Sequence, residues 1–232
     1  MVIDLRGTKR VLSSAPCGGG LRSSRFILNH QVQGDPISSR SWPIGDVNGK
    51  ATHCDPSTTL RLVASRLRLR GSLVGLMTAV PMKRVVKSRA EENGIWVECF
   101  ATVGVTNAVR AGEPLDVAAA MDGANNAGTI NIVVVTNAAL ASSAMVGAIQ
   151  VVTESKTGVL RDQAVSCWTG RPGATGTGTD AVVIACAHRG KGPSQRYSGM
   201  HTAIGAMIGQ VVADGVRQGL ELAKRWAAKA EA

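Results

Sequence analysis

The stretch from Gly128 to Asp162 constrains the fold of this chain more than any other part of the sequence. It opens with GTINIVVVTN, a strand pattern, and continues as a long apolar run with helical spacing. Its first charged residues are Glu154 and Lys156. A buried strand that leads into a buried helix is typical of an α/β protein, and two charges on an otherwise apolar element are candidates for chemistry.

The same kind of pattern predicts further elements on both sides of this stretch. Asp55 and Pro56 indicate a helix start, with a capping carboxylate followed by proline in the first turn, and Gly71 is the predicted stop. The remaining elements are helices from about 138 and over 202–229, and strands at 2–6, 10–15, 25–32, 72–80, 95–105, 128–137 and 181–187. We therefore expect one α/β domain over residues 1–232, with a mixed sheet flanked by helices. An α+β layered sandwich is the alternative.

The predicted helix after Asn137 is apolar on two opposite faces, one containing Leu140 and the other Met145. A helix that is apolar all round is buried, so we expect it to have no solvent-exposed face. Glu154 is expected near the Leu140 face, in a desolvated setting. Lys156 is expected on the opposite face, where its long side chain can reach solvent.

Composition excludes several classes of protein. Hydrophobic residues make up 44% of the chain and charged residues 18%, which indicates a packed globular protein rather than a disordered one. The five cysteines are scattered without a C-x-x-C motif, so neither a disulfide framework nor a zinc site is indicated, and a cytoplasmic location is expected. Residues 1–30 lack the apolar core of a signal peptide. The charge-free run from Gly123 to Thr153 contains several polar residues, which favours a strand and a helix over a membrane span.

The formal net charge of +10 raises the question of nucleic-acid binding. However, the basic residues are spread from Arg6 to Lys229, and four Trp, two Phe and one Tyr are too few for a stacking platform. We therefore expect a solvated basic face and no nucleic-acid partner, with a nucleic-acid-binding module as a less favoured alternative.

Seven segments, in order along the chain, carry a resemblance to a known family. They are SSAPCGGGLRSSRFILNHQV (13–32), GLMTAV (75–80), ATVGVTNAVRAGEP (101–114), GTINIVVVTNAAL (128–140), TESKTGVLRD (153–162), TGTGTDAVVIAC (175–186) and YSGMHTAIGAMIG (197–209). With these segments in register, the chain resembles the adenosylcobinamide amidohydrolase family of corrinoid salvage. The resemblance implies hydrolysis of the amide between aminopropanol and a propionate arm of the corrin ring, releasing adenosylcobyric acid and 1-amino-2-propanol. A cobalt corrinoid is then the substrate, and we expect no cofactor and no bound metal.

One position departs from the pattern of that family. Thr136, Asn137 and Ala138 stand where we expect Thr-Asp-Ala, and an amide cannot act as a base. A corrinoid-binding protein without catalytic activity is therefore an alternative to the hydrolase.

Amide hydrolysis needs a nucleophile, a base and an acid for the departing amine, and the chain has neither a G-x-S-x-G nor an H-E-x-x-H motif. His201 is the leading candidate base, because it precedes the final helix, whose dipole favours a neutral imidazole. The alternative is a surface histidine. Asp180 is a candidate to orient His201 or to hold a water, and the alternative is an aspartate that caps a turn.

Two further catalytic candidates come from the helix and from the first glycine turn. Glu154 is a candidate acid for the leaving amine, or else a partner in a salt bridge. Ser14, with Ser13, is the candidate hydroxyl nucleophile at a strand end, where serines also serve as ordinary turn residues. The Thr/Gly run before Asp180 lacks the lysine and the following helix of a phosphate-binding loop.

A corrin has an apolar face and a rim of amides, so its pocket needs amide or hydroxyl partners. The candidates at strand ends and loops are Asn29, Asn107, Asn131, Thr136, Asn137, Thr177 and Thr179. Strand-end asparagines also cap turns, which is the alternative for each of them. The final helix carries small residues between Gly205 and Gly219, a candidate surface for a homodimer, and no membrane partner is expected.

Overall fold

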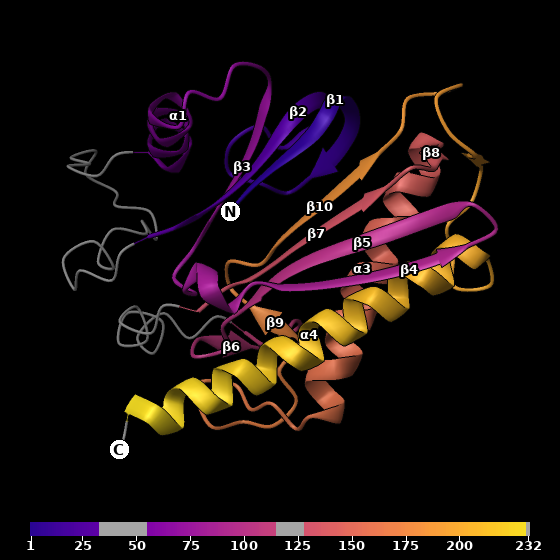
Figure 1. The fold of residues 1–232 in the computed structure, drawn as a ribbon. Helices are drawn as coiled ribbons and strands as arrows, with labels where there is room; N and C mark the ends of the chain where they lie inside the picture. The colour runs from indigo at the N-terminus through magenta and orange to yellow at the C-terminus, as the bar shows by residue number, and fades with distance from the viewer. Residues whose placement is uncertain (33–54, 115–127, 231–232) are drawn as a thin grey trace.

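The computed structural model describes residues 1–32, 55–114 and 128–230 (Figure 1). Its centre is a mixed sheet of seven strands in the order β3-β2-β1-β10-β7-β5-β4. The strands are β1 (Val2–Ser13), β2 (Gly20–Gln31), β3 (Leu73–Thr78), β4 (Val86–Glu92), β5 (Ile95–Val103), β7 (Ile130–Thr136) and β10 (Ala181–Cys186). β2 pairs with β3 in parallel, as β7 does with β10, and the other neighbours are antiparallel.

Within the described residues three α-helices flank this sheet, which confirms the predicted α/β fold. They are α1 (Pro56–Arg66), α3 (Ser142–Asp162) and α4 (Ala203–Ala230), together with the 3-10 turn η2 (Met82–Arg84). Figure 1 shows α3 and α4 on one face of the sheet and α1 beside β2 and β3. Two small ladders complete the fold, β6 (Ala108–Val109) with β9 (Gly176–Thr177), and β8 (Ala139–Leu140) with β11 (Ser194–Gln195). No helix in the described part of the chain has both the length and the hydropathy of a membrane span.

β7 is buried on both faces. Ile132 and Val134 pack under α3 and α4, whereas Val133 and Val135 pack against β1, β2 and β3 on the other side of the sheet. The sheet therefore curls over its own first three strands. A strand covered on both faces reads as a continuous apolar run rather than an alternating one, which explains the IVVV sequence.

α1 begins and ends for local reasons. The Asp55 side chain accepts a hydrogen bond from the Thr58 amide at 3.0 Å, and Pro56 occupies the first turn. The helix ends at Arg66, earlier than the predicted stop at Gly71, because the chain turns at Arg68 with a φ of 54°.

Three further features differ from the prediction. The two short strands expected at the N-terminus form one strand, β1, with an irregular register between Asp4 and Lys9. No element was expected between the strands predicted at 72–80 and 95–105, where the structure has η2 and β4. α3 starts at Ser142 rather than near Ala138, because Leu140 pairs instead with Gln195 of β11.

The expectation that this helix is buried all round is wrong. α3 buries one stripe, which includes Met145, Val152 and Lys156, and exposes Gln150 and Glu154 on its other side. α4 and β10 cover α3 from one side only among the described residues, so its other face meets solvent. The two charged residues therefore have the reverse of the predicted settings, with Glu154 exposed and Lys156 buried.

Ile204, Ile208 and Val211 are buried and form the inner face of α4. Gly219 packs on Val103 of β5, at a distance that leaves no room for a side chain. Gly215 also faces the sheet, Gly205 lies against Ser198 and Gly199, and Gly209 lies against Val151 of α3. These glycines pack within the chain, so they are not free to form the dimer surface considered above.

Candidate active site

A cluster of polar side chains lies where β7 and β10 begin and where β2 and β5 end. We refer to the residues Asn29, Thr102, Asn107, Asn131, Lys156, Thr177 and Asp180 as the strand-edge site. Asp180, just before β10, has both carboxylate oxygens occupied. Oδ2 accepts from Lys156 Nζ at 2.5 Å and from the Thr177 amide at 3.1 Å. Oδ1 accepts from Thr177 Oγ1 at 2.5 Å and from the Ile130 amide at 3.0 Å.

The Lys156–Asp180 pair is buried. Its side chains are 9% and 13% exposed, whereas every other ion pair between described residues has at least one partner that is 43% exposed or more. Gly176 makes room for it, because a Cβ there would lie 2.7 Å from Lys156 Nζ and closer still to the Asp180 carboxylate. Buried charges are expensive to desolvate, so a pair of this kind is a candidate for function.

A row of buried amides lies on the other face of β7. Asn131 donates to Asn29 Oδ1 at 3.0 Å and to the Met77 carbonyl at 2.8 Å, and Asn29 donates to Thr102 Oγ1 at 3.1 Å. Asn29, Asn131 and Thr102 are each 1% exposed. Side chains alternate between the two faces along β7, so Asn131 points away from the face that Ile130 and Ile132 present to α3. Lys156 comes from α3, so the amides and the ion pair flank the same end of β7 from opposite faces.

Two amide oxygens at this site are buried without a donor from the described residues, Asn131 Oδ1 and Asn107 Oδ1. A buried acceptor without a partner costs about 1–3 kcal/mol. A water or an N–H group of a ligand would relieve that cost. The site is therefore suited to a molecule that presents amide donors.

Thr179 has a structural task close by. Its Oγ1 lies 2.5 Å from Thr129 Oγ1 and donates to the Gly128 carbonyl at 3.1 Å. These contacts fasten the turn before β10 to the start of β7.

Thr136 and Asn137 lie at the opposite end of β7, so they do not join the strand-edge site. Asn137 Oδ1 accepts from the Trp96 amide at 2.9 Å, and its Nδ2 donates to the Gly94 carbonyl at 2.9 Å. Thr136 Oγ1 donates to the Trp96 carbonyl at 2.6 Å. At about 3.3 Å per residue, six residues separate Asn137 from Asn131 by roughly 20 Å. These side chains close the β4–β5 hairpin onto β7.

Ser14 lies near the strand-edge site, but it is engaged with the backbone. Its Oγ accepts from the Val182 amide at 3.1 Å, and its own amide donates to the Val182 carbonyl at 3.1 Å. Ser14 thus extends the β1–β10 ladder. In the described parts of the chain no carboxylate or imidazole contacts its hydroxyl, so the structure offers no base for it as a nucleophile.

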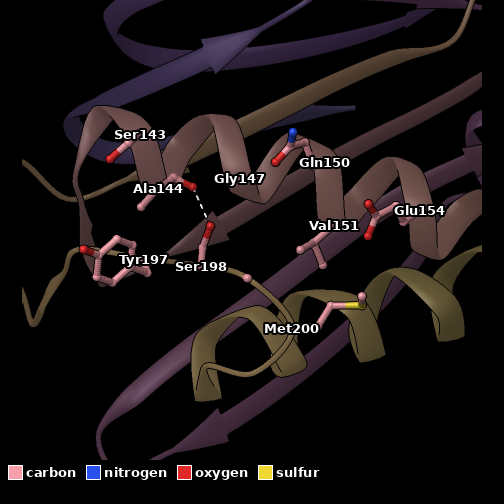
Figure 2. A pocket seen from close by; sticks show the side chains of 10 residues that line it. Ser143, Ala144, Gly147, Gln150, Val151, Glu154, Tyr197, Ser198 and Met200 are labelled. Atoms are coloured by element: carbon pink, nitrogen blue, oxygen red, sulfur yellow. Dashed lines mark hydrogen bonds between the residues drawn. The ribbon is translucent and has the colours of Figure 1, made fainter.

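Glu154 lines a groove of about 290 Å³ between α3 and residues 197–200 (Figure 2). Gln150 extends from the same helix, and Tyr197 and Met200 form the other wall. Residues 197–200 are fixed to α3 where Ser198 Oγ donates to the Ala144 carbonyl at 2.6 Å. A second hollow, of about 320 Å³, lies beside β8 and β11. Both are at the small end of ligand pockets.

His201 is exposed in the turn before α4, whose first turn is capped by Thr202 Oγ1, 3.1 Å from the Gly205 amide. The turn with His201 follows Ser198, which is bound to Ala144 near the start of α3. Lys156 lies twelve residues after Ala144 on the same helix, roughly 18 Å away at 1.5 Å per residue. The hydrogen-bond partners of Asp180 among the described residues are Lys156, Thr177 and Ile130, so His201 is not brought into contact with it. Within the described ranges, no three His, Cys, Asp or Glu side chains form a group that could hold a metal ion.

Comparison with known proteins gives a match over nearly the whole chain. The family model described as adenosylcobinamide amidohydrolase matches residues 1–228. The chain belongs to the adenosylcobinamide amidohydrolase family. A protein of that name from Methanosarcina mazei is 30% identical over 178 residues, which cover 72% of this chain and 76% of the relative. One from Halobacterium salinarum is 30% identical over 204 residues, covering 85% and 80%.

A third relative carries no functional name. It is an uncharacterized protein from Methanocaldococcus jannaschii, 26% identical over 236 aligned positions that cover 95% of this chain and 85% of the relative.

The segments that carry the resemblance to adenosylcobinamide amidohydrolases meet at the strand-edge site. Six of the seven contribute a side chain or carbonyl to it, in chain order Asn29, Met77, Thr102 with Asn107, Asn131, Lys156, and Thr177 with Asp180. The seventh, residues 197–209, forms a wall of the groove beside Glu154. Convergence from six parts of the chain makes the strand-edge site the better candidate for the chemistry of the family.

The sequence did not single out Thr102, and it noted Lys156 as a charge on an apolar element but assigned it no role in the site. Lys156 lies on the same buried stripe of α3 as Val152 and Val159, four residues after the first and three before the second. Helical periodicity counted from the observed start at Ser142 would therefore have placed Lys156 inside the protein. No sequence pattern marks Thr102 as part of the site, because its hydrogen-bond partner Asn29 is distant in the sequence.

Proposed function

We propose that this protein hydrolyses the amide between aminopropanol and the propionate arm of adenosylcobinamide, giving adenosylcobyric acid and 1-amino-2-propanol. The observation that carries the proposal is the convergence of six family segments on the strand-edge site, which contains the buried Lys156–Asp180 pair. The family name states an amidohydrolase acting on adenosylcobinamide, and the strand-edge site has the charged and amide groups that such a reaction needs.

The two sides of this site have different tasks in the proposal. The amides of Asn29, Asn107 and Asn131 pair with the carboxamide rim of the corrinoid, and the unsatisfied oxygens of Asn107 and Asn131 accept its N–H groups. Asp180, held in place by Lys156, handles protons at the scissile amide. Thr179 supports this arrangement through the turn before β10.

The setting of the reaction is part of the proposal. The corrinoid is the substrate rather than a cofactor, and adenosylcobyric acid then re-enters cobamide synthesis in corrinoid salvage. A cytoplasmic location is supported by four buried, free cysteines, Cys17, Cys99, Cys167 and Cys186. A homodimer would have to use a surface other than the glycines of α4.

The direct test is incubation of the purified protein with adenosylcobinamide, with release of 1-amino-2-propanol followed by mass spectrometry. We expect stoichiometric appearance of aminopropanol and adenosylcobyric acid. Lys156→Met should slow release by about 10²-fold or more, since it removes a charge from the reacting groups. The matched control is Lys224→Met, an exposed lysine on α4, which should behave as wild type.

The same experiment separates the alternatives. Corrinoid binding without release of aminopropanol would contradict hydrolysis and indicate a binding protein. Retention on DNA or RNA that falls steeply with salt, with no corrinoid binding, would indicate a nucleic-acid-binding module.

A further inference from the structure

Few hydroxyl groups in the described residues are placed beside a base. Two donate a hydrogen bond to a carboxylate, Thr58 Oγ1 to Asp55 at 3.3 Å and Thr177 Oγ1 to Asp180 at 2.5 Å. Thr58 and Asp55 are the exposed cap of α1. Thr177 is 9% exposed and belongs to the strand-edge site. Ser14, the sequence-based candidate, has only the Val182 amide on its hydroxyl.

The carboxylate beside Thr177 is fixed in position. Lys156 Nζ and the Thr177 amide hold Asp180 Oδ2, and the Ile130 amide shares Oδ1 with the threonine hydroxyl. A clamped base keeps its free lone pair aimed at one hydroxyl, which is the arrangement of an activated nucleophile with an orienting third group. Lys156 is then the positioning residue.

The residue after Thr177 adds a donor for the oxyanion. Gly178 is exposed, and a Cβ at this position would have no atom within 4 Å. A substrate carbonyl can therefore approach its backbone closely. The N–H group that follows a nucleophile in the chain is a common oxyanion donor in acyl-transfer enzymes.

We propose that Thr177 Oγ1 is the nucleophile that attacks the scissile amide, with Asp180 as its base. This inference rests on the proposed function. The Oγ1–C bond forms as the hydroxyl proton moves to Asp180, and the C–N bond then breaks as that proton passes to the departing nitrogen. The products of this half-reaction are 1-amino-2-propanol and an ester between Thr177 and the corrin propionate. Water attacks the ester carbon and gives one proton to Asp180, and the C–Oγ1 bond then breaks as that proton returns to Thr177 Oγ1. The corrin propionic acid leaves and releases its remaining proton to solvent.

The first test removes only the hydroxyl. Thr177→Val keeps the branched shape, and we expect aminopropanol release to fall by about 10³-fold or more. Thr177→Ser keeps a hydroxyl on the same carbon and should stay within about tenfold of wild type. Thr58→Ala is the matched control, because it deletes the other hydroxyl that donates to a carboxylate, and it should leave release unchanged.

The second test uses the wild-type protein, so it does not depend on how the variants fold. Hydroxylamine added during turnover should divert the ester to a corrinoid hydroxamate, and acid-quenched samples should show acyl mass on the peptide that contains Thr177. Active wild type that forms no hydroxamate and no adduct, or Thr177→Val with normal release, would overturn the inference and leave the proposed function standing. Absence of aminopropanol release by wild type would instead reject the proposed function.

Discussion

Lys156 Nζ lies 2.5 Å from Asp180 Oδ2, and this contact joins the buried stripe of α3 to the start of β10. The two side chains are paired with each other in the interior, and both lie in segments that carry the family resemblance. The pair thus links the fold to the candidate chemistry. A lysine that was expected to reach solvent is instead one of the innermost charges in the described structure.

Gly176→Ala should disrupt this pair. The new Cβ would lie 2.7 Å from Lys156 Nζ and closer to Asp180, so one of the two side chains must move. We expect both the melting temperature and the rate of aminopropanol release to fall. Gly178→Ala is the control two residues away, where a Cβ meets nothing and stability should change by less than about 1 kcal/mol. Equal losses of melting temperature in the two variants would contradict the close approach at Gly176.

Stability and activity should separate in a double variant. Lys156→Met alone leaves Asp180 charged and buried, and we expect a loss of about 3–5 kcal/mol in the free energy of unfolding, measured by urea denaturation. Adding Asp180→Asn removes the isolated charge and should restore part of that loss while activity stays absent. Recovery of activity in the double variant would show that the pair is only structural.

Acid should weaken the sheet through Glu98 of β5. Burial alone raises the pKa of Glu98, but hydrogen bonds from Arg89 and Lys87 outweigh it, so the pKa lies below its ordinary value of 4.5. A carboxyl with a lowered folded pKa stabilises the fold above its unfolded pKa, and this contribution is lost as pH falls through the folded value. The melting temperature should therefore drop below about pH 4.5, and less so in Glu98→Gln. Glu221→Gln, at an exposed site on α4, should keep the wild-type profile.

Asn137→Asp tests whether the missing acid matters. The amide of Asn137 donates to the Gly94 carbonyl, a bond that a carboxylate cannot make, so we expect a loss of about 1 kcal/mol in stability. The position is at the far end of β7, and kcat should stay within about twofold of wild type. A large gain in kcat would support the alternative that Asn137 has weakened an ancestral activity.

Elements governed by local chemistry could be predicted from the sequence. The cap at Asp55 fixed the start of α1, and the apolar run placed β7 within two residues of its observed bounds, Ile130–Thr136. The start of α3 could not be predicted in this way, since it depends on Leu140 pairing with Gln195, a residue far along the chain.

The candidate site was predictable only in part. Asp180, Asn29 and Asn131 were recognised as polar residues at strand ends. However, Lys156 is 24 residues from its partner Asp180, and Asn29 is 102 residues from its partner Asn131. Thr136 and Asn137 were placed in the same pocket, although the length of β7 alone puts them at its other end. Glu154 was expected to be buried and Lys156 to reach solvent, which is the reverse of the structure. The sequence shows that both faces of the helix are apolar, but it does not show which face the neighbouring elements cover.

The central claim is that the amide is cleaved at the strand-edge site rather than in the groove beside α3. The most direct measurement is the single-turnover rate of aminopropanol release in Asp180→Asn, compared with Glu154→Gln and His201→Ala under saturating adenosylcobinamide. We predict a fall of about 10³-fold for Asp180→Asn and rates within about threefold of wild type for the other two. A folded Asp180→Asn protein with nearly normal release, alongside inactive Glu154→Gln or His201→Ala, would contradict this account.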